Sequence, residues 1–575
     1  MDGMKKMVLI FTTVAGLFLV PACNTGNPDT NIDINTGDDS SDFVEEQKWD
    51  TTVTIVWNGA SAVVGDLPDG VTVKNENGYV TVTSTAKHVE YAVSGSGSGQ
   101  LKLYSDYKFC LSLNNLTLSC VDGPAVNNQC GKSLYVVLAG DNVLTDGSTY
   151  TESVEDQKAA LFSEGQILVS GEGLLTVNGN YKHAVASDDY IRVREGQLTL
   201  SAVSDGLHAN DGIIINGGDI TVTASSEGIQ CDTSSVLVTG GNVNIASAGD
   251  KGILAYSTVE ISGGSVTVTS VDKGIKSKAG NINISGGSSV NITTTGDDGK
   301  GILAKLGQVN ISGGVVTVST AGSSAKGIKA QGNISISGGT LTVICSCGSS
   351  TQRMASAPPG GGGGQPGGGG QPGGGNESSG PEGIESKSAL TVSGGTVYAQ
   401  SSDDAVNSGG DMTISGGYVC AYSTGNDGLD ANGNCYISGG IVYAIGSSSP
   451  EVAIDANTEQ QKQLYVTGGT IVAIGGLESG SSLKQSCYSA SSWSAGKWYA
   501  LSSGGTVFAF MTPASGGSSL VVSAASTPTL TADVTVTGGT SVFNGMGNLN
   551  GTPSGGTAVS LSAYTGGSGM GGPKW

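Results

Sequence analysis

A repeat of 23 to 27 residues governs what this chain can fold into. It is clearest between residues 203 and 343, where pairs of glycines recur. Six pairs belong to this stretch: Gly217-Gly218, Gly240-Gly241, Gly263-Gly264, Gly286-Gly287, Gly313-Gly314 and Gly338-Gly339. A second series, in which a charged residue is followed by glycine and an aliphatic residue, recurs out of phase with the pairs. A period of this length indicates a solenoid, in which each repeat buries its apolar face only by stacking on its neighbours.

One repeat shows the local structure that we expect. In residues 259–268, apolar and polar residues alternate on either side of a Gly-Gly pair, so one face of each short strand points inward. Glycine allows the left-handed backbone conformation that such a corner needs. No long stretch has helical periodicity, and the Leu/Asn signature of leucine-rich repeats is absent. We therefore predict an all-β chain that forms a parallel β-helix, with about a dozen coils and a length on the order of 60 Å.

The repeat also divides the chain into segments. Residues 49–100 have alternating patterns and are expected to form an N-terminal β cap, because an open terminal coil is an adhesive edge. Residues 101–476 are expected to form the β-helix, with glycine runs and Gln-Pro pairs at 351–380 that cannot bury a core. Since the repeat continues on both sides, we interpret residues 351–380 as a loop extruded from one helix; a linker between two domains is the alternative. The period fades beyond residue 476, so residues 477–575 are expected to form a C-terminal β cap.

The N-terminus has the features of an export signal. Lys5 and Lys6 precede an apolar run that is too short to span a membrane as a mature helix. Residues 20–23, with the sequence VPAC, resemble a bacterial lipobox, which implies removal of residues 1–22 and lipidation of Cys23. An ordinary signal peptide with an incidental cysteine is the alternative. Residues 23–48 are polar and acidic and predict a flexible tether. The expected location is the bacterial cell envelope, through a lipid anchor, with the face of the membrane left open.

Charge and the scarcity of metal-binding residue types narrow the range of functions. The net charge of −22 argues against nucleic acid as a partner and suits divalent cations. The cysteines other than Cys23 are scattered without CxxC pairs, which argues against a zinc site and a dense disulfide framework, and we expect most of them to be buried. His88, His183 and His208 also lie far apart in the sequence, so zinc chemistry is not expected. We interpret His208 as a stacked polar residue in a coil corner.

Acidic residues gather at the corners of three late coils. When these coils are aligned, Asn407, Asp430 and Asp455 fall in one column, and Asp404 and Asp427 fall in the next. Carboxylates held about 5 Å apart repel one another unless something neutralises them. Because Ca²⁺ prefers oxygen ligands of this kind, we predict a calcium site formed by these five residues. The alternative is an Asn/Asp ladder that satisfies backbone groups at the corners without a metal.

The middle coils carry a column of lysines instead. Four lysines begin the charged-Gly-Ile motifs, and two more lie one position past the aliphatic residue: Lys251, Lys273, Lys300 and Lys326, then Lys276 and Lys329. Aspartates precede several of them, so one interpretation is a salt-bridge ladder, which is worth little per pair. The other interpretation is a groove whose lysines bind the carboxylates of an acidic polysaccharide.

An ordered series of motifs resembles a bacterial family, the carbohydrate-binding, right-handed parallel β-helix proteins related to pectate lyases. The motifs lie at residues 159–177, 204–210, 226–230 and 425–434, followed by final coils after a glycine-rich excursion that is also similar. The resemblance covers roughly residues 100–475. It implies a right-handed β-helix, an extracellular location, calcium on the helix and a plant-type, acidic polysaccharide as ligand. In the related lyases, aspartates hold calcium beside a lysine or arginine base. Here the lysine column lies before the inserted loop, which argues against lyase activity.

Taken together, these features predict a monomeric, lipid-anchored envelope protein that binds a uronate-containing, pectin-like polysaccharide without cleaving it. One alternative is a calcium-dependent polysaccharide lyase in which Lys273 or Lys300 removes the proton beside a uronate carboxylate. A second alternative is a structural adhesin, in which the charged columns only hold the stack together.

Overall fold

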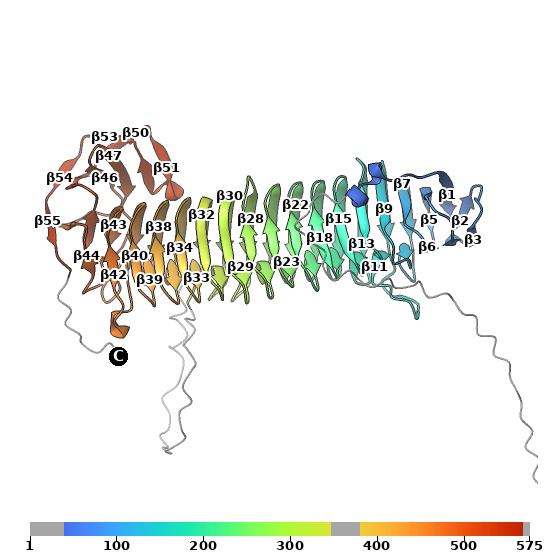
Figure 1. Cartoon of the computed structure of the whole chain (residues 1–575), viewed down its shortest axis with the longest axis horizontal. Coiled ribbons are helices and arrows are strands. Elements are labelled where there is room, and N and C mark those ends of the chain that lie inside the picture. Colours follow the sequence, from blue (N-terminus) through green and yellow to red (C-terminus); the bar gives the residue numbers. More distant parts are fainter. Residues whose placement is uncertain (1–39, 347–379, 567–575) are drawn as a thin grey trace, which may run out of the picture.

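The computed structural model describes residues 40–346 and 380–566, and within them the chain is nearly all β. It forms a parallel β-helix of about 14 turns, as the repeat predicts. Figure 1 shows the coils stacked along a straight rod, with the N-terminal strands at one end and the C-terminal antiparallel strands at the other. No helix in the described ranges is long and apolar enough to cross a membrane.

Most coils contribute three short strands, which form three parallel rows along the rod. One row is a separate 15-stranded sheet, and the other two rows belong to a 32-stranded sheet. The strands of the 15-stranded sheet are β3 (Val71–Glu76), β4 (Tyr79–Ser84), β6 (Gln100–Ser105), β8 (Val126–Asn128), β11 (Ala159–Ser163), β14 (His183–Ser187), β17 (Leu207–Ala209), β20 (Ile229–Cys231), β23 (Lys251–Ala255), β26 (Lys273–Ser277), β29 (Lys300–Ala304), β31 (Lys326–Ala330), β33 (Ile384–Ser386), β36 (Val406–Ser408) and β39 (Leu429–Ala431).

The 32-stranded sheet holds the other two rows, which three long strands connect across the turn between them. The connecting strands are β7 (Phe109–Ser119), β30 (Val309–Thr320) and β32 (Ile334–Cys345). The first row adds β9 (Leu134–Ala139), β12 (Ile167–Ser170), β15 (Tyr190–Val193), β18 (Gly212–Ile215), β21 (Val236–Val238), β24 (Val259–Ile261), β27 (Ile282–Ile284), β34 (Leu390–Val392), β37 (Met412–Ile414), β40 (Cys435–Ile437), β42 (Leu464–Val466) and β44 (Ser482–Leu483). The second row adds β10 (Asp141–Thr145), β13 (Leu174–Gly179), β16 (Gln197–Ala202), β19 (Asp219–Ala224), β22 (Asn242–Ala248), β25 (Ser265–Ser270), β28 (Ser289–Thr294), β35 (Thr396–Ser401), β38 (Tyr418–Ser423), β41 (Ile441–Ile445) and β43 (Thr470–Ile474).

The interior is filled by columns of equivalent apolar side chains. One column belongs to the 15-stranded sheet, where each member pairs in register with the next and none is exposed: Ile229, Ile253, Ile275, Ile302, Ile328 and Ile384. Stacking thus buries every member except at the ends of the rod. The eight cysteines among the described residues are all buried, as expected, whereas Cys23 and Cys347 lie outside those residues.

The two glycine series have different physical causes. In most Gly-Gly pairs the second glycine has a positive φ, as at Gly264 with φ +71°, which confirms the left-handed corner. The glycine between the charged and the aliphatic residue is needed for close packing instead. A Cβ on Gly274 would lie 2.2 Å from Cγ2 of Ile292 and 2.5 Å from the carbonyl oxygen of Gly301. A side chain at this position would therefore collide with the neighbouring row and the next coil.

The stack continues across the inserted segment. Strand β31 pairs in register with β33, and β32 pairs with both β34 and β35, although residues 347–379 lie between them in the sequence. The coils on the two sides of the insertion are therefore direct neighbours. The proposed loop at 351–380 falls almost entirely outside the described residues.

At the N-terminal end, β1 (Thr51–Gly59) pairs with β5 (Val89–Ser98) in parallel and with β2 (Ser61–Val64) in an antiparallel hairpin. The segment before β1 differs from the flexible tether that we expected over residues 23–48. Residues 40–48 contain two 3₁₀ turns, η1 (Ser40–Asp42) and η2 (Val44–Glu46), which lie against the first row. Asp42 is buried there and pairs with Arg192 at 2.9 Å, so a specific ion pair holds this part of the acidic segment.

At the C-terminal end, an antiparallel cap covers the last coils (Figure 1). It contains a 6-stranded sheet and a 2-stranded sheet, and further strands extend the 32-stranded sheet. Its strands are β45 (Cys487–Ala490), β46 (Trp498–Ser503), β47 (Thr506–Met511), β48 (Leu520–Ser523), β49 (Thr529–Ala532), β50 (Thr535–Thr537), β51 (Thr540–Val542), β52 (Gly547–Leu549), β53 (Thr552–Ser554), β54 (Thr557–Val559) and β55 (Leu561–Tyr564), with a short 3₁₀ turn, η5 (Phe543–Gly545). Phe508 and Phe510 of the cap pack against Tyr443 of the second row, so the cap covers the side of the rod as well as its end.

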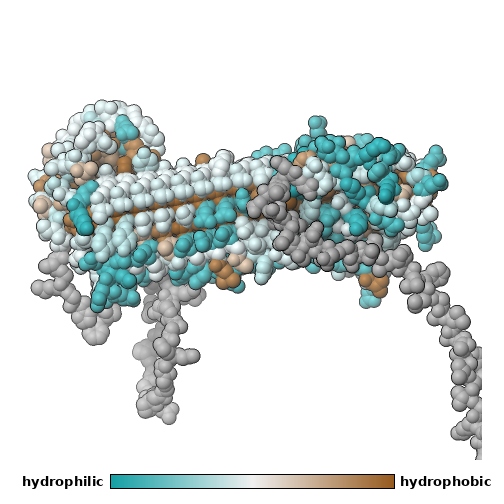
Figure 2. Space-filling view, in the orientation of Figure 1, coloured by the Kyte–Doolittle hydropathy of each residue, from teal (hydrophilic) through white to brown (hydrophobic). Residues whose placement is uncertain are grey.

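Seen from outside, equivalent positions form straight rows. Figure 2 shows pale and hydrophilic rows on either side of a narrow hydrophobic stripe that runs along the middle coils. Each kind of surface chemistry is therefore extended along the rod rather than confined to one coil.

The close-packing role of Gly274 makes a testable prediction. Gly274→Ala should lower the unfolding midpoint in urea, with a loss of about 1–3 kcal/mol, because the added methyl overpacks the contact with Ile292. Gly287→Ala is the matched control, since a Cβ there meets nothing within 4 Å and the backbone is not left-handed. Equal midpoints for the two variants would contradict the packing explanation.

Candidate functional site

The outer face of the 15-stranded sheet carries two neighbouring columns of polar side chains. The edge column lies two positions before the buried aliphatic residue, at the first residue of a strand or just before it. The central column lies one position after that aliphatic residue, where side chains point outward. The edge column consists of His183, Asp205, Glu227, Lys251, Lys273, Lys300, Lys326, Glu382, Asp404 and Asp427. The central column consists of His208, Gln230, Leu254, Lys276, Leu303, Lys329, Glu385, Asn407, Asp430 and Asp455. All the predicted calcium and lysine positions therefore lie on one face.

The acidic end of this face brings the predicted calcium ligands together. Asp427, Asp430 and Asp455 each have a carboxylate oxygen within 4.8 Å of the other two. Asn407 lies between carboxylates, and its Nδ2 donates to Oδ2 of Asp404 at 3.0 Å and to Oδ2 of Asp430 at 2.7 Å. The amide of Asn407 thus links the edge column to the central column by hydrogen bonds at the position where carboxylates of both columns lie close together.

Burial and crowding shift the pKa values of these carboxyls. Burial raises the pKa of Asp430 to about 8, and the charges of Asp404 and Asp427 add to the rise. Burial also raises the pKa of Asp455 to about 10, with a further contribution from Glu478. Glu478 extends the central column by one coil and was not singled out from the sequence, because the glycine period fades there. Carboxyls of this kind hold protons at neutral pH unless a cation takes their place.

The lysines of the edge column are engaged with carboxylates. Their partners are the preceding aspartate or a carboxylate of the adjoining coil: Asp250 and Glu227 for Lys251, Asp272 for Lys273, Asp298 for Lys300, and Glu382 and Glu385 for Lys326. The salt-bridge interpretation therefore describes these four lysines.

Lys276 of the central column has different surroundings. It forms no ion pair with any described residue, and it is only partly exposed. Burial lowers its pKa, and the charges of Lys251, Lys273 and Lys305 lower it further. We call the part of the face that carries Lys251, Lys273, Lys276 and Lys300 the lysine region. At its centre, Lys276 is a half-buried cation among other cations.

A buried ion network separates the lysine region from the acidic end. Nζ of Lys326 lies 2.5 Å from Glu382 and 3.0 Å from Glu385, and all three side chains are at most 5% exposed. Lys329 and Lys387 also contact Glu385, at 3.4 and 2.5 Å. Burial alone would raise the pKa of Glu385, but Lys326, Lys387 and Lys329 together lower it to about 2. Neither glutamate stood out in the sequence, although both fall on the same period as the lysines.

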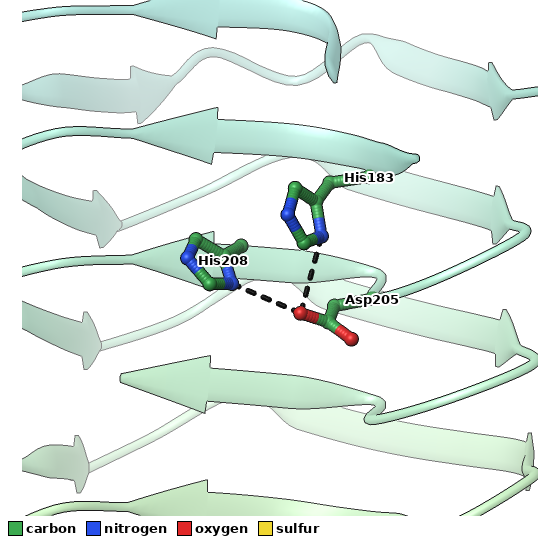
Figure 3. A group of neighbouring side chains, drawn as sticks. All are labelled: His183, Asp205 and His208. Atoms are coloured by element: carbon green, nitrogen blue, oxygen red, sulfur yellow. Dashed lines mark hydrogen bonds and ion pairs between the residues drawn. The ribbon is translucent and has the colours of Figure 1, made fainter. Parts of the chain in front are cut away.

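At the other end of the face, two histidines share one carboxylate (Figure 3). Nδ1 of His183 and Nδ1 of His208 lie 3.1 and 2.9 Å from Oδ2 of Asp205, and the two rings stack with centroids 4.1 Å apart. All three residues are buried, and burial lowers the pKa of His183. The sequence separation of the histidines, on which the expectation of no zinc chemistry was based, does not keep this pair apart in space. His183 and His208 are 25 positions apart, which corresponds to one coil and brings them into contact.

The architecture defines the chain as a capped parallel β-helix with a charged outer face. Comparison with known proteins then gives its family. The model of the family "carbohydrate-binding domain-containing protein" matches residues 76–278 and 251–428, which together exceed half of the chain. The chain therefore belongs to the carbohydrate-binding domain family, in agreement with the resemblance seen in the sequence.

Two individual proteins are also similar. A carbohydrate-binding domain-containing protein of Acetivibrio thermocellus is 27% identical over 158 residues, which is 27% of this chain and 54% of that protein. The chain thus spans about half the length of this relative. A solved structure, the gadolinium derivative of a polysaccharide lyase-like protein from C. thermocellum, is 23% identical with a TM-score of 0.35. It matches over 41% of this chain and 96% of that one, and at this TM-score we draw no inference from it.

The buried network at Lys326 makes a pH-dependent prediction. Lys326→Met should destabilise the protein by about 3 kcal/mol at pH 7, because breaking a buried ion pair leaves a carboxylate without its main partner. The folded pKa of Glu385 lies below its ordinary value of 4.5, so its stabilisation is present above pH 4.5 and is lost as the pH falls toward 2. The difference in unfolding midpoint between the wild type and the variant should therefore shrink over that range.

The control for this measurement is Lys305→Met, which removes a lysine that has no described ion pair and should change stability by less than about 0.5 kcal/mol. A difference between wild type and Lys326→Met that stays constant from pH 7 to pH 3 would contradict the role of the Glu385 charge.

Proposed function

We propose that this protein binds an acidic, uronate-containing polysaccharide along the outer face of its 15-stranded sheet, with Ca²⁺ at the acidic end and without cleaving the chain. The observation that carries the proposal is the pairing of two complementary features on one face. Lys276 forms no ion pair with a described residue and can take an anion, and Asp427, Asp430 and Asp455 bring three carboxylates within 4.8 Å of one another and can take a cation. A polymer of carboxylates together with Ca²⁺ supplies both.

The acidic cluster suits calcium for chemical reasons. Ca²⁺ takes six to eight oxygen ligands at about 2.3–2.6 Å in flexible geometry. Three carboxylates within 4.8 Å of one another, with Asp404 held close by Asn407, provide that donor set. The raised pKa values of Asp430 and Asp455 reflect the burial and repulsion that a divalent cation would relieve. A bound Ca²⁺ that keeps open positions would also bridge to the carboxylates of a uronate chain.

The lysine region suits the same ligand. A ligand carboxylate beside Lys276 would supply the negative charge that its neighbouring lysines do not. Lys276 and Asp430 lie in the same column, five strand spacings or about 24 Å apart. A linear polysaccharide laid along the rod would reach both the lysines and the calcium, whereas a small sugar would reach one.

The distance between base and cation supports the proposal that the protein binds without cleavage. A general base must lie within hydrogen-bond reach of the proton that it removes. Lys329 lies three strand spacings from Asp430, about 14 Å, and it pairs with Glu385, as does Lys387. The proposal therefore gives the lysines a binding role and assigns no catalytic residue.

The same proposal places the protein in the bacterial cell envelope, anchored by a lipid on Cys23 after removal of residues 1–22. It is supported by the sequence of the export signal alone. A Cys23→Ala variant that still fractionates with membranes would exclude the anchor.

Charge reversal tests the lysine region. Lys276→Glu should lower the affinity for polygalacturonate by about tenfold or more, equivalent to at least about 1.4 kcal/mol, because it replaces the proposed contact with a repulsion. Lys273→Glu and Lys300→Glu should also weaken binding, since they reverse the surrounding charge. Affinity gel electrophoresis measures the effect, with fully methyl-esterified polymer as a ligand without charge. Lys497→Glu, exposed on the C-terminal cap, is the control. Equal affinities for Lys276→Glu and Lys497→Glu would exclude the lysine region.

Removal of calcium tests the acidic end. Asp430→Asn combined with Asp455→Asn should abolish calorimetric Ca²⁺ binding and weaken polygalacturonate retention to the level that a chelator produces in the wild type, because the principal ligands have lost their charge. Absorbance of unsaturated product, measured in parallel, should stay at background. Formation of that product by the wild type in Ca²⁺ would instead establish a lyase. Absence of binding to a broad set of glycans would favour a structural adhesin.

A further inference from the structure

We propose that His183, Asp205 and His208 form a binding site for one divalent transition-metal ion, with Zn²⁺ as the best match. The site lies on the coils of β14 and β17, at the N-terminal end of the two polar columns, whereas the acidic cluster lies at their C-terminal end (Figure 3). It is independent of the proposed polysaccharide function. The three residues come from two adjacent coils, and one ligand atom from each lies within 4.8 Å of the others.

The distances fit a tetrahedral ion. With bonds of about 2.0–2.1 Å, two ligands of tetrahedral zinc are about 3.3 Å apart. Oδ2 of Asp205 lies 3.1 Å from Nδ1 of His183 and 2.9 Å from Nδ1 of His208. In Figure 3 both of these nitrogens point toward the same carboxylate oxygen. The three ligand atoms lie within 4.8 Å of one another, so one ion could contact all of them after small movements of the side chains.

The hydrogen bonding of His183 is incomplete without such an ion. Its side chain is only 2% exposed, yet neither Nδ1 nor Nε2 has a hydrogen-bond partner. The 3.1 Å contact of Nδ1 with Asp205 has ion-pair distance but lacks hydrogen-bond alignment. A buried polar atom without a partner is destabilising, so its presence beside a carboxylate points to a missing ligand.

Asp232 can hold His208 in the tautomer that a metal site needs. Nε2 of His208 lies 3.3 Å from Oδ2 of Asp232, so this nitrogen can face a carboxylate with its proton. In that tautomer Nδ1 has a lone pair free for a metal ion, whereas in the other tautomer it donates to Oδ2 of Asp205 at 2.9 Å. A carboxylate on the far nitrogen of a metal-bound histidine is the usual way in which proteins orient such a ligand. The side chain of Asp232 is 40% exposed, which places the site just beneath the surface.

The choice of metal follows from the donors. Two imidazoles and one carboxylate suit Zn²⁺ and similar transition metals, whereas Ca²⁺ prefers oxygen. The site and the acidic cluster lie eight strand spacings apart, about 38 Å, so an ion at one does not share ligands with the other. Saturation with Ca²⁺ therefore separates the two sites in an experiment.

The test is calorimetric titration of the purified full chain with Zn²⁺ in excess Ca²⁺, after removal of metals with chelator. The wild type should bind one Zn²⁺ per chain, and Co²⁺ should give the visible absorption of a tetrahedral complex. His183→Gln and His208→Gln should each lower the affinity about 100-fold or more, and Asp232→Asn about tenfold. His88→Gln is the matched control, because His88 also contacts an aspartate, Asp50 at 2.9 Å, but on the exposed surface.

Two results would overturn the site: no uptake of Zn²⁺ by the wild type in excess Ca²⁺, or equal affinities for His183→Gln, His208→Gln and His88→Gln. Circular dichroism and unfolding midpoints in chelator show whether the variants fold. If they do not, X-ray absorption at the zinc edge of the loaded wild type decides, since two imidazole ligands support the site and an all-oxygen shell contradicts it.

Discussion

Stacking in register brings every side chain of the β-helix to within one strand spacing, about 4.8 Å, of its equivalent in the next coil. For apolar residues this is favourable, and the isoleucine column of the 15-stranded sheet is buried throughout as a result. At glycine positions, stacking allows the backbone to approach the next coil and the neighbouring row so closely that no Cβ fits, as at Gly274. For charged residues it is unfavourable, because a like charge lies above and below each member. On the outer face of the rod, the repulsion between stacked like charges must therefore be offset by oppositely charged groups.

The compensation changes along the face. In the lysine region, aspartates from the preceding turns and Glu227 neutralise the edge column, so Lys251, Lys273 and Lys300 become part of the scaffold. At the junction, Lys326 and two buried glutamates neutralise one another. At the two ends this internal balance fails: the rings of His183 and His208 converge on one oxygen, and three carboxylates meet at the acidic cluster. We propose that a cation from outside completes the charge balance at these two positions, with imidazole selecting one kind of metal and oxygen the other.

The sequence predicts the parts of this protein that follow from the repeat. The glycine period and alternating strands are sufficient for the β-helix, because each coil contacts only its neighbours. Alignment on the period also brought Asp430 and Asp455 into one column. The pair of histidines was missed for the same geometric reason, since residues one coil apart look distant unless the period is used as the unit of contact. Glu382 was missed because the insertion separates it from Lys326 by 56 residues.

Contacts outside the repeat could not be predicted in this way. Asp42 reaches Tyr190, 148 residues away, through a short segment with no periodic pattern. The cap packs Phe508 and Phe510 on the outside of the second row, a contact between segments that share no register. Such contacts depend on shape and on single ion pairs. The same argument explains why residues 40–48 differ from the tether that their acidic composition suggested.

The order of chemistries along the rod has a consequence for recognition. A polymer with one carboxylate per sugar presents a regular row of identical charges, and a β-helix presents rows of side chains at a regular spacing. The spacing of the sugars and the spacing of the coils differ, so the two rows stay aligned over a few units only. Affinity for a uniform column of side chains would therefore not grow steadily with the length of the polymer. On this face Lys276, which has no described ion pair, and the acidic cluster lie about 24 Å apart, so a ligand needs to make only two fixed contacts. The segment between them is tolerant of mismatch, because Lys326, Lys329 and their glutamates are already neutralised. If the protein binds a polysaccharide as we propose, two fixed points joined by a neutral stretch would favour a long, linear acidic chain, because only such a chain gains the effective concentration that links the second contact to the first.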